Sequence, residues 1–256
     1  MPRFHVRPEA VQGDVVSFDA EETHHLARVL RIGPGELVRA LDGRGFELTV
    51  RLTAVHPRGA IGTLIGREPI ATESPLALTL AQGVPKGDKM ESIVRMATEL
   101  GARQIAPLLT ERTVVRLDAR GWTARQRRWQ RVAQESAKQC GRAVVPAVAG
   151  PMPLASWLGA RRATDVLVCL CEAEMIGLDE VLPTGPLPGA ALVVGPEGGL
   201  SDAEVEAIRQ AGGLVAGLGP RVLRTETAGP VGLAILQARH GDLTGGGVVP
   251  ARRGRS

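Results

Sequence analysis

Two short glycine-rich segments near the C-terminus hold the residues whose types and spacing could do chemistry. The first, at 195–201, reads GPEGGLS and follows the apolar run 190–194, and the second, at 218–228, reads LGPRVLRTETA. Glycine tolerates a positive φ and lets backbone amides and carbonyls approach a ligand closely. In α/β proteins such turns lie at the carboxyl ends of sheet strands, where ligands bind. Two of them after neighbouring strands predict the walls of one site.

These segments resemble the SPOUT superfamily of RNA methyltransferases, and more narrowly the bacterial family that methylates uridine N3 in 16S (small-subunit) ribosomal RNA. The resemblance covers nearly the whole chain, from Arg3 to about Asp242. The combination of GPEGG-L-S with LG-x-R-V-LRTETA is specific, whereas neither half alone would be. Upstream the resemblance is carried by HHL at 24–26, VLR at 29–31, ELG at 99–101, ER at 111–112 and QCGR at 139–142.

The resemblance implies S-adenosylmethionine as the cofactor, bent into a pocket formed by three loops, at 170–172, 195–200 and 218–225. Leucines there could enclose the adenine while backbone groups read its edge, although the same leucines could be plain core and the glycines plain turns. Glu197 could balance the cofactor's charge, bind its ribose, or orient its own loop by accepting backbone amides. The expected cofactor-binding residues are Leu170, Gly195, Glu197, Gly198, Gly199, Leu218, Gly219, Leu223 and Thr225.

Methylation at uridine N3 sets two demands on the catalytic residues. N3 must lie in line with the methyl group, and the charge that develops on the uracil carbonyl oxygens must be stabilised. An arginine fork suits the second demand, so Arg224 is the first catalytic candidate. A base must also reach the N3 proton, and Glu226 is the candidate. Glu226 could equally be a helix-start residue that interacts with the helix dipole.

Positive charge is unevenly distributed and indicates an RNA partner. The net charge is +4, but residues 103–142 hold ten Lys and Arg against three Asp and Glu, whereas residues 1–70 are balanced. A local excess favours a phosphate-rich partner, with a solvated helix face as the alternative. Arg142 could instead reach a partner subunit. The candidate RNA-binding residues are Arg3, Arg7, His25, Arg28, Arg31, Arg112, Arg127, Arg128 and Arg142.

Composition excludes several other classes of protein. No apolar run is long enough to span a membrane, and residues 1–20 lack the apolar core of a secretory signal. Three cysteines argue against a disulfide framework, and His24 and His25 have no acidic or cysteine partner at ligand spacing. Dinucleotide and P-loop glycine motifs are missing. We therefore expect a cytoplasmic protein that uses neither a membrane nor a metal.

The pattern of elements predicts two domains and a tail. Residues 1–70 read as a small β-barrel, PUA-like by resemblance, with one helix at 24–30. Residues 75–243 alternate strands and helices, which predicts an α/β domain with a largely parallel sheet, and residues 244–256 read as a disordered tail. The resemblance further implies a SPOUT-type, deep C-terminal trefoil knot, which periodicity alone would never propose.

The last helix is expected at 228–240, with Thr227 as its cap and Pro230 in its first turn. It is apolar around much of its circumference, and Gly229 and Gly232 would permit close packing across a two-fold axis. This agrees with the family's homodimers, which bind 16S ribosomal RNA within the small subunit. Two alternatives stay open: a SPOUT ribose 2′-O-methyltransferase, and a non-catalytic RNA-binding protein of ribosome assembly.

Overall fold

The computed structural model describes residues 3–70 and 72–244, and the chain divides into two compact units. The first unit comprises the residues up to Glu73 together with Ala137–Val145, and the second begins at Ser74. The sequence assigns 137–145 to the second domain. In the structure they pack with the first unit, where the amide of Gly45 donates to the Ala143 carbonyl (3.2 Å). Of the predicted tail, residues 245–256 lie outside the described part.

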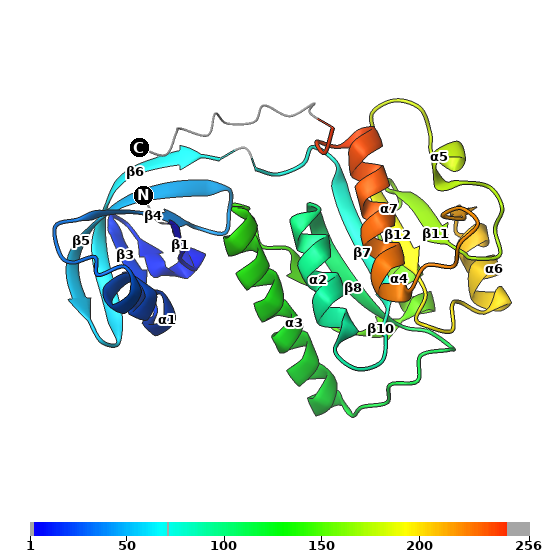
Figure 1. Cartoon of the computed structure of the whole chain (residues 1–256), viewed down its shortest axis with the longest axis horizontal. Helices are drawn as coiled ribbons and strands as arrows, with labels where there is room; N and C mark the ends of the chain where they lie inside the picture. The colour runs from blue at the N-terminus through cyan, green and yellow to red at the C-terminus, as the bar shows by residue number, and fades with distance from the viewer. Residues whose placement is uncertain (1–2, 71, 245–256) are drawn as a thin grey trace. The chain divides into compact units, whose positions relative to one another are not determined.

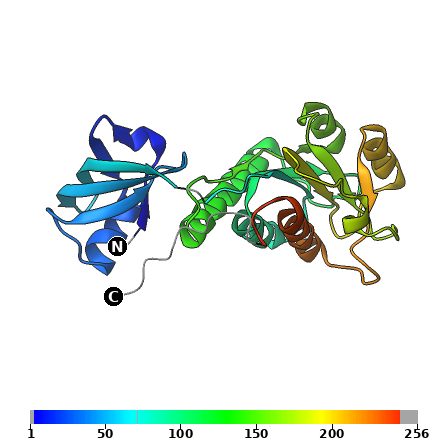
Figure 2. The ribbon, with the colours of Figure 1, turned by 90° about the horizontal axis from the view of Figure 1, so that it is seen from above.

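The first unit is built on a six-stranded sheet in the order β1-β4-β5-β6-β3-β2, antiparallel except for the β1–β4 pair. Its strands curl around a core that includes Phe4, Val16, Leu26 and Leu48 (Figure 2). This confirms the PUA-like β-domain. The strands are β1 (Arg3–His5), β2 (Val11–Gln12), β3 (Val15–Phe18), β4 (Leu37–Leu41), β5 (Phe46–His56) and β6 (Gly59–Pro69).

The helix of this unit begins earlier than predicted. Helix α1 spans Ala20–His24, because the side chain of Asp19 accepts a hydrogen bond from the Glu22 amide (2.9 Å) and caps it. A π-helical turn, His25–Val29, continues it. Leu26 of this turn is fully buried in the core of the sheet.

The second unit contains a parallel sheet in the order β10-β8-β7-β12-β11-β13, with β9 paired to β8. Strands β11 and β12 are almost entirely buried, as the apolar runs predict for a sheet covered on both faces. The strands are β7 (Ala77–Gly83), β8 (Ala102–Leu109), β9 (Ala147–Val148), β10 (Met152–Pro153), β11 (Val166–Leu170), β12 (Gly189–Val194) and β13 (Leu214–Ala216).

Helices cover both faces of this sheet. Figure 2 shows α2 (Lys89–Glu99) and α7 (Thr225–His240) together on one face, and α4 (Leu154–Ala160) with α6 (Asp202–Gln210) on the other. A capping box opens α6, with Ser201 and Glu204 exchanging hydrogen bonds. The remaining helices are α3 (Ala119–Cys140) and the short α5 (Leu178–Val181). The α/β architecture is therefore confirmed.

Helix α7 corrects two predictions. It begins at Thr225 rather than 228, and Arg224 occupies the cap position without a side-chain cap, so Thr227 is not the cap. Pro230 consequently lies in the second turn, where its missing N–H leaves the Glu226 carbonyl without its helical partner. The small residues of α7 also serve packing within the chain itself. A Cβ at Gly232 would lie 2.7 Å from Leu192, so this glycine lets α7 pack closely on its own sheet.

The last helix contacts an earlier loop. Helix α7 packs on β7 and β12, while the connection from β11 to β12, residues 171–188, lies across its far end (Figure 1). Arg239 pairs with Asp179 (3.1 Å), and His240 Nδ1 lies 2.9 Å from the Gly185 carbonyl of that connection. The final turn of the last helix is thus held against this connection, which is consistent with the SPOUT knot.

Candidate functional site

A pocket of about 670 Å³ opens where β11, β12 and β13 end. Three loops line it, at 170–175, 194–200 and 218–226, and Lys89 and Arg112 complete the wall. The structure therefore brings together the three segments that the sequence singled out, although they are far apart along the chain. Of the predicted cofactor and catalytic residues, all except Gly198 line the pocket; they are Leu170, Gly195, Glu197, Gly199, Leu218, Gly219, Leu223, Arg224, Thr225 and Glu226.

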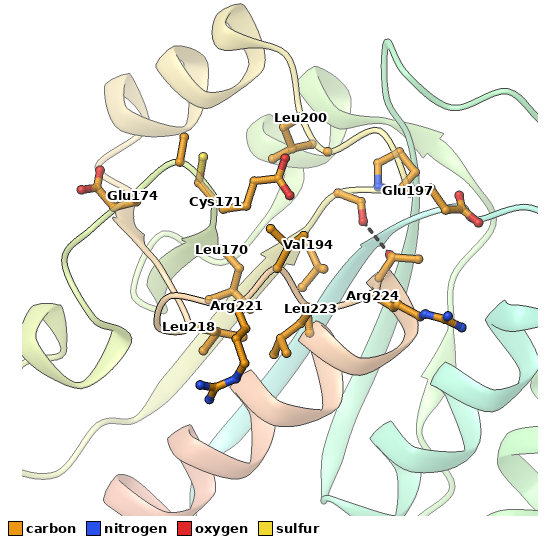
Figure 3. A pocket seen from close by; sticks show the side chains of 18 of the residues that line it. Leu170, Cys171, Glu174, Val194, Glu197, Leu200, Leu218, Arg221, Leu223 and Arg224 are labelled. Atoms are coloured by element: carbon orange, nitrogen blue, oxygen red, sulfur yellow. Dashed lines mark hydrogen bonds between the residues drawn. The ribbon is translucent and has the colours of Figure 1, made fainter.

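The floor of the pocket is apolar. Figure 3 shows Leu170, Val194, Leu218 and Leu223 gathered at its centre, with Arg224 and Glu197 to one side and Glu174 to the opposite side. An apolar slot with polar groups at its ends suits a flat base that carries a charged extension. The residues present therefore fit S-adenosylmethionine, whose adenine would rest against the leucines.

The first glycine loop is held by contacts at nearly every residue. The Gly199 amide donates to the Pro196 carbonyl (2.9 Å), and Arg112 Nη1 donates to the Gly198 carbonyl (2.7 Å). A Cβ at Gly195 would lie 2.7 Å from the backbone carbon of Gly199, so no side chain has room there. Gly199 instead has a φ of +70°. The two glycines are required for different reasons, close approach and backbone conformation.

Glu197 faces the start of α2. Its carboxylate accepts hydrogen bonds from the Lys86 amide (3.1 Å) and from Lys89 Nζ (2.9 Å). Burial acts to raise the pKa of Glu197, but the hydrogen bonds from Lys89 and from backbone amides outweigh it, so this pKa lies below its ordinary value. Of the roles considered for Glu197, the structure favours orientation of its own loop.

Glu226 and Arg224 differ in how they are held. Glu226 Oε2 lies 3.5 Å from Lys89 Nζ. Hydrogen bonding to Glu197, and then the charges of both carboxylates, raise the pKa of Lys89. The Arg224 side chain is exposed, and within residues 3–70 and 72–244 it makes no hydrogen bond or ion pair. A guanidinium without a partner at a pocket edge is available for a substrate oxygen.

Gln82 belongs to the support of this site and was missed by the sequence reasoning. Its side chain is fully buried at the end of β7, and its Nε2 donates to Thr225 Oγ1 (2.9 Å) and to the Gly195 carbonyl (3.3 Å). Thr225 Oγ1 in turn donates to the same carbonyl (2.7 Å). One amide thus joins the first loop to the start of α7. The available signal was an amide side chain in a predominantly apolar strand-like run.

Metal and thiol chemistry find no support in the site. No group of His, Cys, Asp and Glu that could hold a metal ion occurs among the described residues. Burial raises the pKa of Cys169 to about 12, with the neighbouring Cys171 adding to the effect. This thiol is therefore protonated and unreactive at neutral pH.

The predicted RNA-binding residues fall into three groups. Arg7, Arg28, Arg31 and Arg127 are exposed. Others already have protein partners: Arg3 pairs with Glu47 (2.8 Å), Arg128 pairs with Glu91 (2.7 Å), Arg112 binds the first glycine loop, and the His25 ring packs edge-on against Phe4. Arg142 is a correction, because it is 4% exposed and its guanidinium is paired with Glu73 inside the first unit.

Comparison with known proteins agrees with this fold and site. The model of an RNA methyltransferase domain matches residues 72–237, and that of an RNA methyltransferase PUA domain matches residues 18–65. Two curated relatives are named ribosomal RNA small subunit methyltransferase E. The one from Bacillus subtilis is 35% identical over 83% of this chain and 85% of its own, and the one from Synechocystis is 35% identical over 92% and 77%.

Solved structures give the same result. Ribosomal RNA small subunit methyltransferase E from Neisseria gonorrhoeae, bound to S-adenosylmethionine, has a TM-score of 0.84 and 32% identity, with 94% of this chain and 99% of that chain covered. A methyltransferase from Legionella pneumophila with bound S-adenosylmethionine gives the same score and identity, over 94% and 98%.

Fold and pocket together define an RNA methyltransferase of the SPOUT class. More narrowly, the chain belongs to the ribosomal RNA small subunit methyltransferase E family, whose cofactor is S-adenosylmethionine. None of the helices in the described ranges is long and apolar enough to cross a membrane.

Proposed function

We propose that this chain transfers a methyl group from S-adenosylmethionine to N3 of a uridine in 16S ribosomal RNA. The observation that carries the proposal is the unpaired guanidinium of Arg224 at the pocket edge, two residues from the Glu226 carboxylate. The names of the relatives support ribosomal RNA as the substrate. The position on the base is inferred from the chemistry that these two side chains offer.

The three glycine-rich or apolar loops would hold the cofactor. Leu170, Leu218 and Leu223 would enclose the adenine, and the bare backbone of Gly195 and Gly219 would approach its polar edges. When bound, S-adenosylmethionine supplies an electrophilic methyl group. The chain's own residues then have to orient the uracil and manage one proton.

Glu226 and Arg224 divide that task. The N3–H bond breaks as the proton passes to the Glu226 carboxylate, directly or through one water. The electron pair left on N3 would form the bond to the methyl carbon while the methyl–sulfur bond breaks and S-adenosylhomocysteine leaves. The negative charge spreads onto the uracil oxygens during this step. Arg224 donates hydrogen bonds to one of them, so the guanidinium acts where charge develops in the transition state.

Further parts of the proposal concern the partners. Arg7, Arg28, Arg31 and Arg127 are exposed and would contact RNA phosphates, which fix orientation rather than sequence. We further propose a homodimer that acts in the cytoplasm on the small ribosomal subunit.

The test is methyl transfer from labelled S-adenosylmethionine to small subunits and to naked 16S RNA that lack the native modification. Nucleoside digestion and mass spectrometry should find the label in N3-methyluridine. Label in a ribose-methylated nucleoside would select a 2′-O-methyltransferase instead. Absence of label on both substrates would favour a binding protein of ribosome assembly.

A second arm tests Arg224. Arg224→Ala should lower kcat about 100-fold, which is typical for removal of one donor to a developing oxyanion, and should leave the calorimetric affinity for S-adenosylmethionine unchanged. Arg221→Ala, three residues earlier in the same loop, is the control and shows whether removing any arginine from this loop lowers kcat. Equal kcat in wild type and Arg224→Ala would remove Arg224 from the mechanism.

A further inference from the structure

Among the described residues, Lys89 is the one side chain that contacts a charged residue in each of the two glycine-rich segments. Its Nζ lies 2.9 Å from Glu197 Oε1 in the first glycine loop and 3.5 Å from Glu226 Oε2 at the start of α7. Lys89 itself belongs to neither segment, since it opens helix α2. Three charges from three separate elements therefore meet at one edge of the pocket.

Helix stability does not explain a lysine at this position. The amino end of a helix carries partial positive charge, so a cation there is disfavoured, and an acidic or small polar residue would suit the helix better. Burial does not explain the Lys89 side chain either, because 39% of it is exposed to solvent. Its placement is explained by the two carboxylates that it faces.

The environment of Glu226 gives the lysine a specific task. Glu226 Oε2 is buried from solvent and makes no hydrogen bond within residues 3–70 and 72–244, so the ammonium at 3.5 Å is the charge that faces it. An ammonium group this close attracts the carboxylate and holds the side chain in place. Without Lys89, Glu226 and Glu197 would face each other's charge, and the Glu226 side chain would be free to turn to solvent.

We propose that Lys89 is a positioning residue for methyl transfer, which keeps the Glu226 carboxylate directed into the pocket while tying it to the first glycine loop through Glu197. The proposal deepens the proposed function and rests on Glu226 as the base. Lys89 acts through Glu226 and does not itself take the proton, because an ammonium group has no lone pair to accept one.

The experiment is a double-mutant cycle on the full chain, with methyl transfer to small subunits as the readout. Lys89→Met should lower kcat about 30-fold and leave KM for the RNA within about threefold, and Lys89→Arg should restore most of the loss. In the Glu226→Gln background, Lys89→Met should cost less than about threefold further, because coupled residues are not additive. Arg95→Met, which removes an exposed cation from the same helix, is the matched control.

Two further measurements separate positioning from damage. The thermal midpoint should be the same for Lys89→Met and Arg95→Met, and the calorimetric affinity for S-adenosylmethionine should change less than about threefold, because the Lys86 amide still holds Glu197. If Lys89→Met lowers kcat by the same factor in the Glu226→Gln background as in the wild type, the proposal is overturned, because Lys89 would then contact the RNA itself. Unchanged kcat in Lys89→Met would overturn it as well.

Failure of the proposed function gives a different result. If wild type labels a nucleoside other than N3-methyluridine, the function is wrong, and the cycle can still be measured on whichever product forms. If N3-methyluridine forms but Glu226→Gln is fully active, the function stands, and Lys89 loses the residue through which it is proposed to act.

Discussion

The two glycine-rich segments that meet in the pocket are built in opposite ways. In the first, Gly195, Glu197, Gly198 and Gly199 each make a contact that fixes the backbone, and partners come from β7, α2, α7 and the segment after β8. In the second, residues 218–223 form no hydrogen bond with any part of the described chain. Val222 there is 75% exposed.

Only the ends of the second segment are fixed. Before it, the Gly217 amide donates to the Ile176 carbonyl (2.8 Å), and after it, Thr225 is held by Gly195 and Gln82. Gly219 has a φ of +83° and open space around it. The first wall of the pocket is therefore preformed, and the second is anchored at both ends but able to adapt to what enters. A site that must receive both a small cofactor and a large RNA has use for both kinds of wall.

The largest effect is expected when the preformed wall is disturbed. Gly195→Ala would place its Cβ 2.7 Å from the backbone of Gly199, which cannot move without losing the turn that follows. We expect the affinity for S-adenosylmethionine to fall about 100-fold or more, as overpacking forces the backbone to shift. Isothermal titration calorimetry measures it. An affinity within threefold of wild type would mean that the first loop is not preformed.

A smaller effect is expected where the two walls are joined. Thr225→Val removes the hydroxyl that donates to the Gly195 carbonyl and receives Gln82. A buried group left unpaired costs about 1–3 kcal/mol, so cofactor affinity should fall about tenfold. Thr225→Ser keeps the hydroxyl and is the matched control. If both variants bind equally well, the methyl group rather than the hydrogen bond is what matters at this position.

The ion pair of the first wall gives a pH-dependent prediction. Glu197→Gln should lower the free energy of unfolding by about 0.5–1 kcal/mol at pH 7, as for a partly exposed pair. The pKa of Glu197 is lowered in the folded chain. Its contribution to stability is therefore fully present above pH 4.5, the ordinary pKa of a glutamate, and is lost as the pH falls further. Urea unfolding of both proteins at several pH values should therefore show a constant difference from pH 7 to 5. A difference that shrinks within that range would contradict the lowered pKa.

The smallest effect is expected in the adaptable wall. Gly219→Ala meets no atom within 4 Å and adds only the strain of a positive φ. That strain is about 1 kcal/mol, so cofactor affinity should fall no more than about fivefold. Calorimetry alongside Gly195→Ala gives the direct comparison. Equal losses in the two variants would erase the distinction between the walls.

Sequence reasoning reached the architecture and the loops of the pocket because both depend on local pattern. Apolar runs predict buried strands, and the run at 190–194 lies within the fully buried strand β12, Gly189–Val194. The two glycine motifs marked two of the segments that line the pocket, and the resemblance added the third, at 170–172.

What sequence reasoning missed depends on neighbours that are distant along the chain. The start of α7 is set by Thr225 bonding to Gly195, and no local cap signals it. Arg142 reads as a surface cation until Glu73 is seen beside it. Gln82 and Lys89 carry no motif of their own, and their importance comes from which loops they meet.

The position of the last helix ties activity to completed synthesis. Both the adaptable wall and the residues Arg224, Thr225 and Glu226 follow the strand β13, and they reach the pocket only once α7 has packed on the sheet beside the 171–188 loop. A chain that has left the ribosome only as far as β13 holds the first wall but no second one. Nascent or prematurely ended chains therefore cannot compete for the cofactor, and only a finished molecule can methylate.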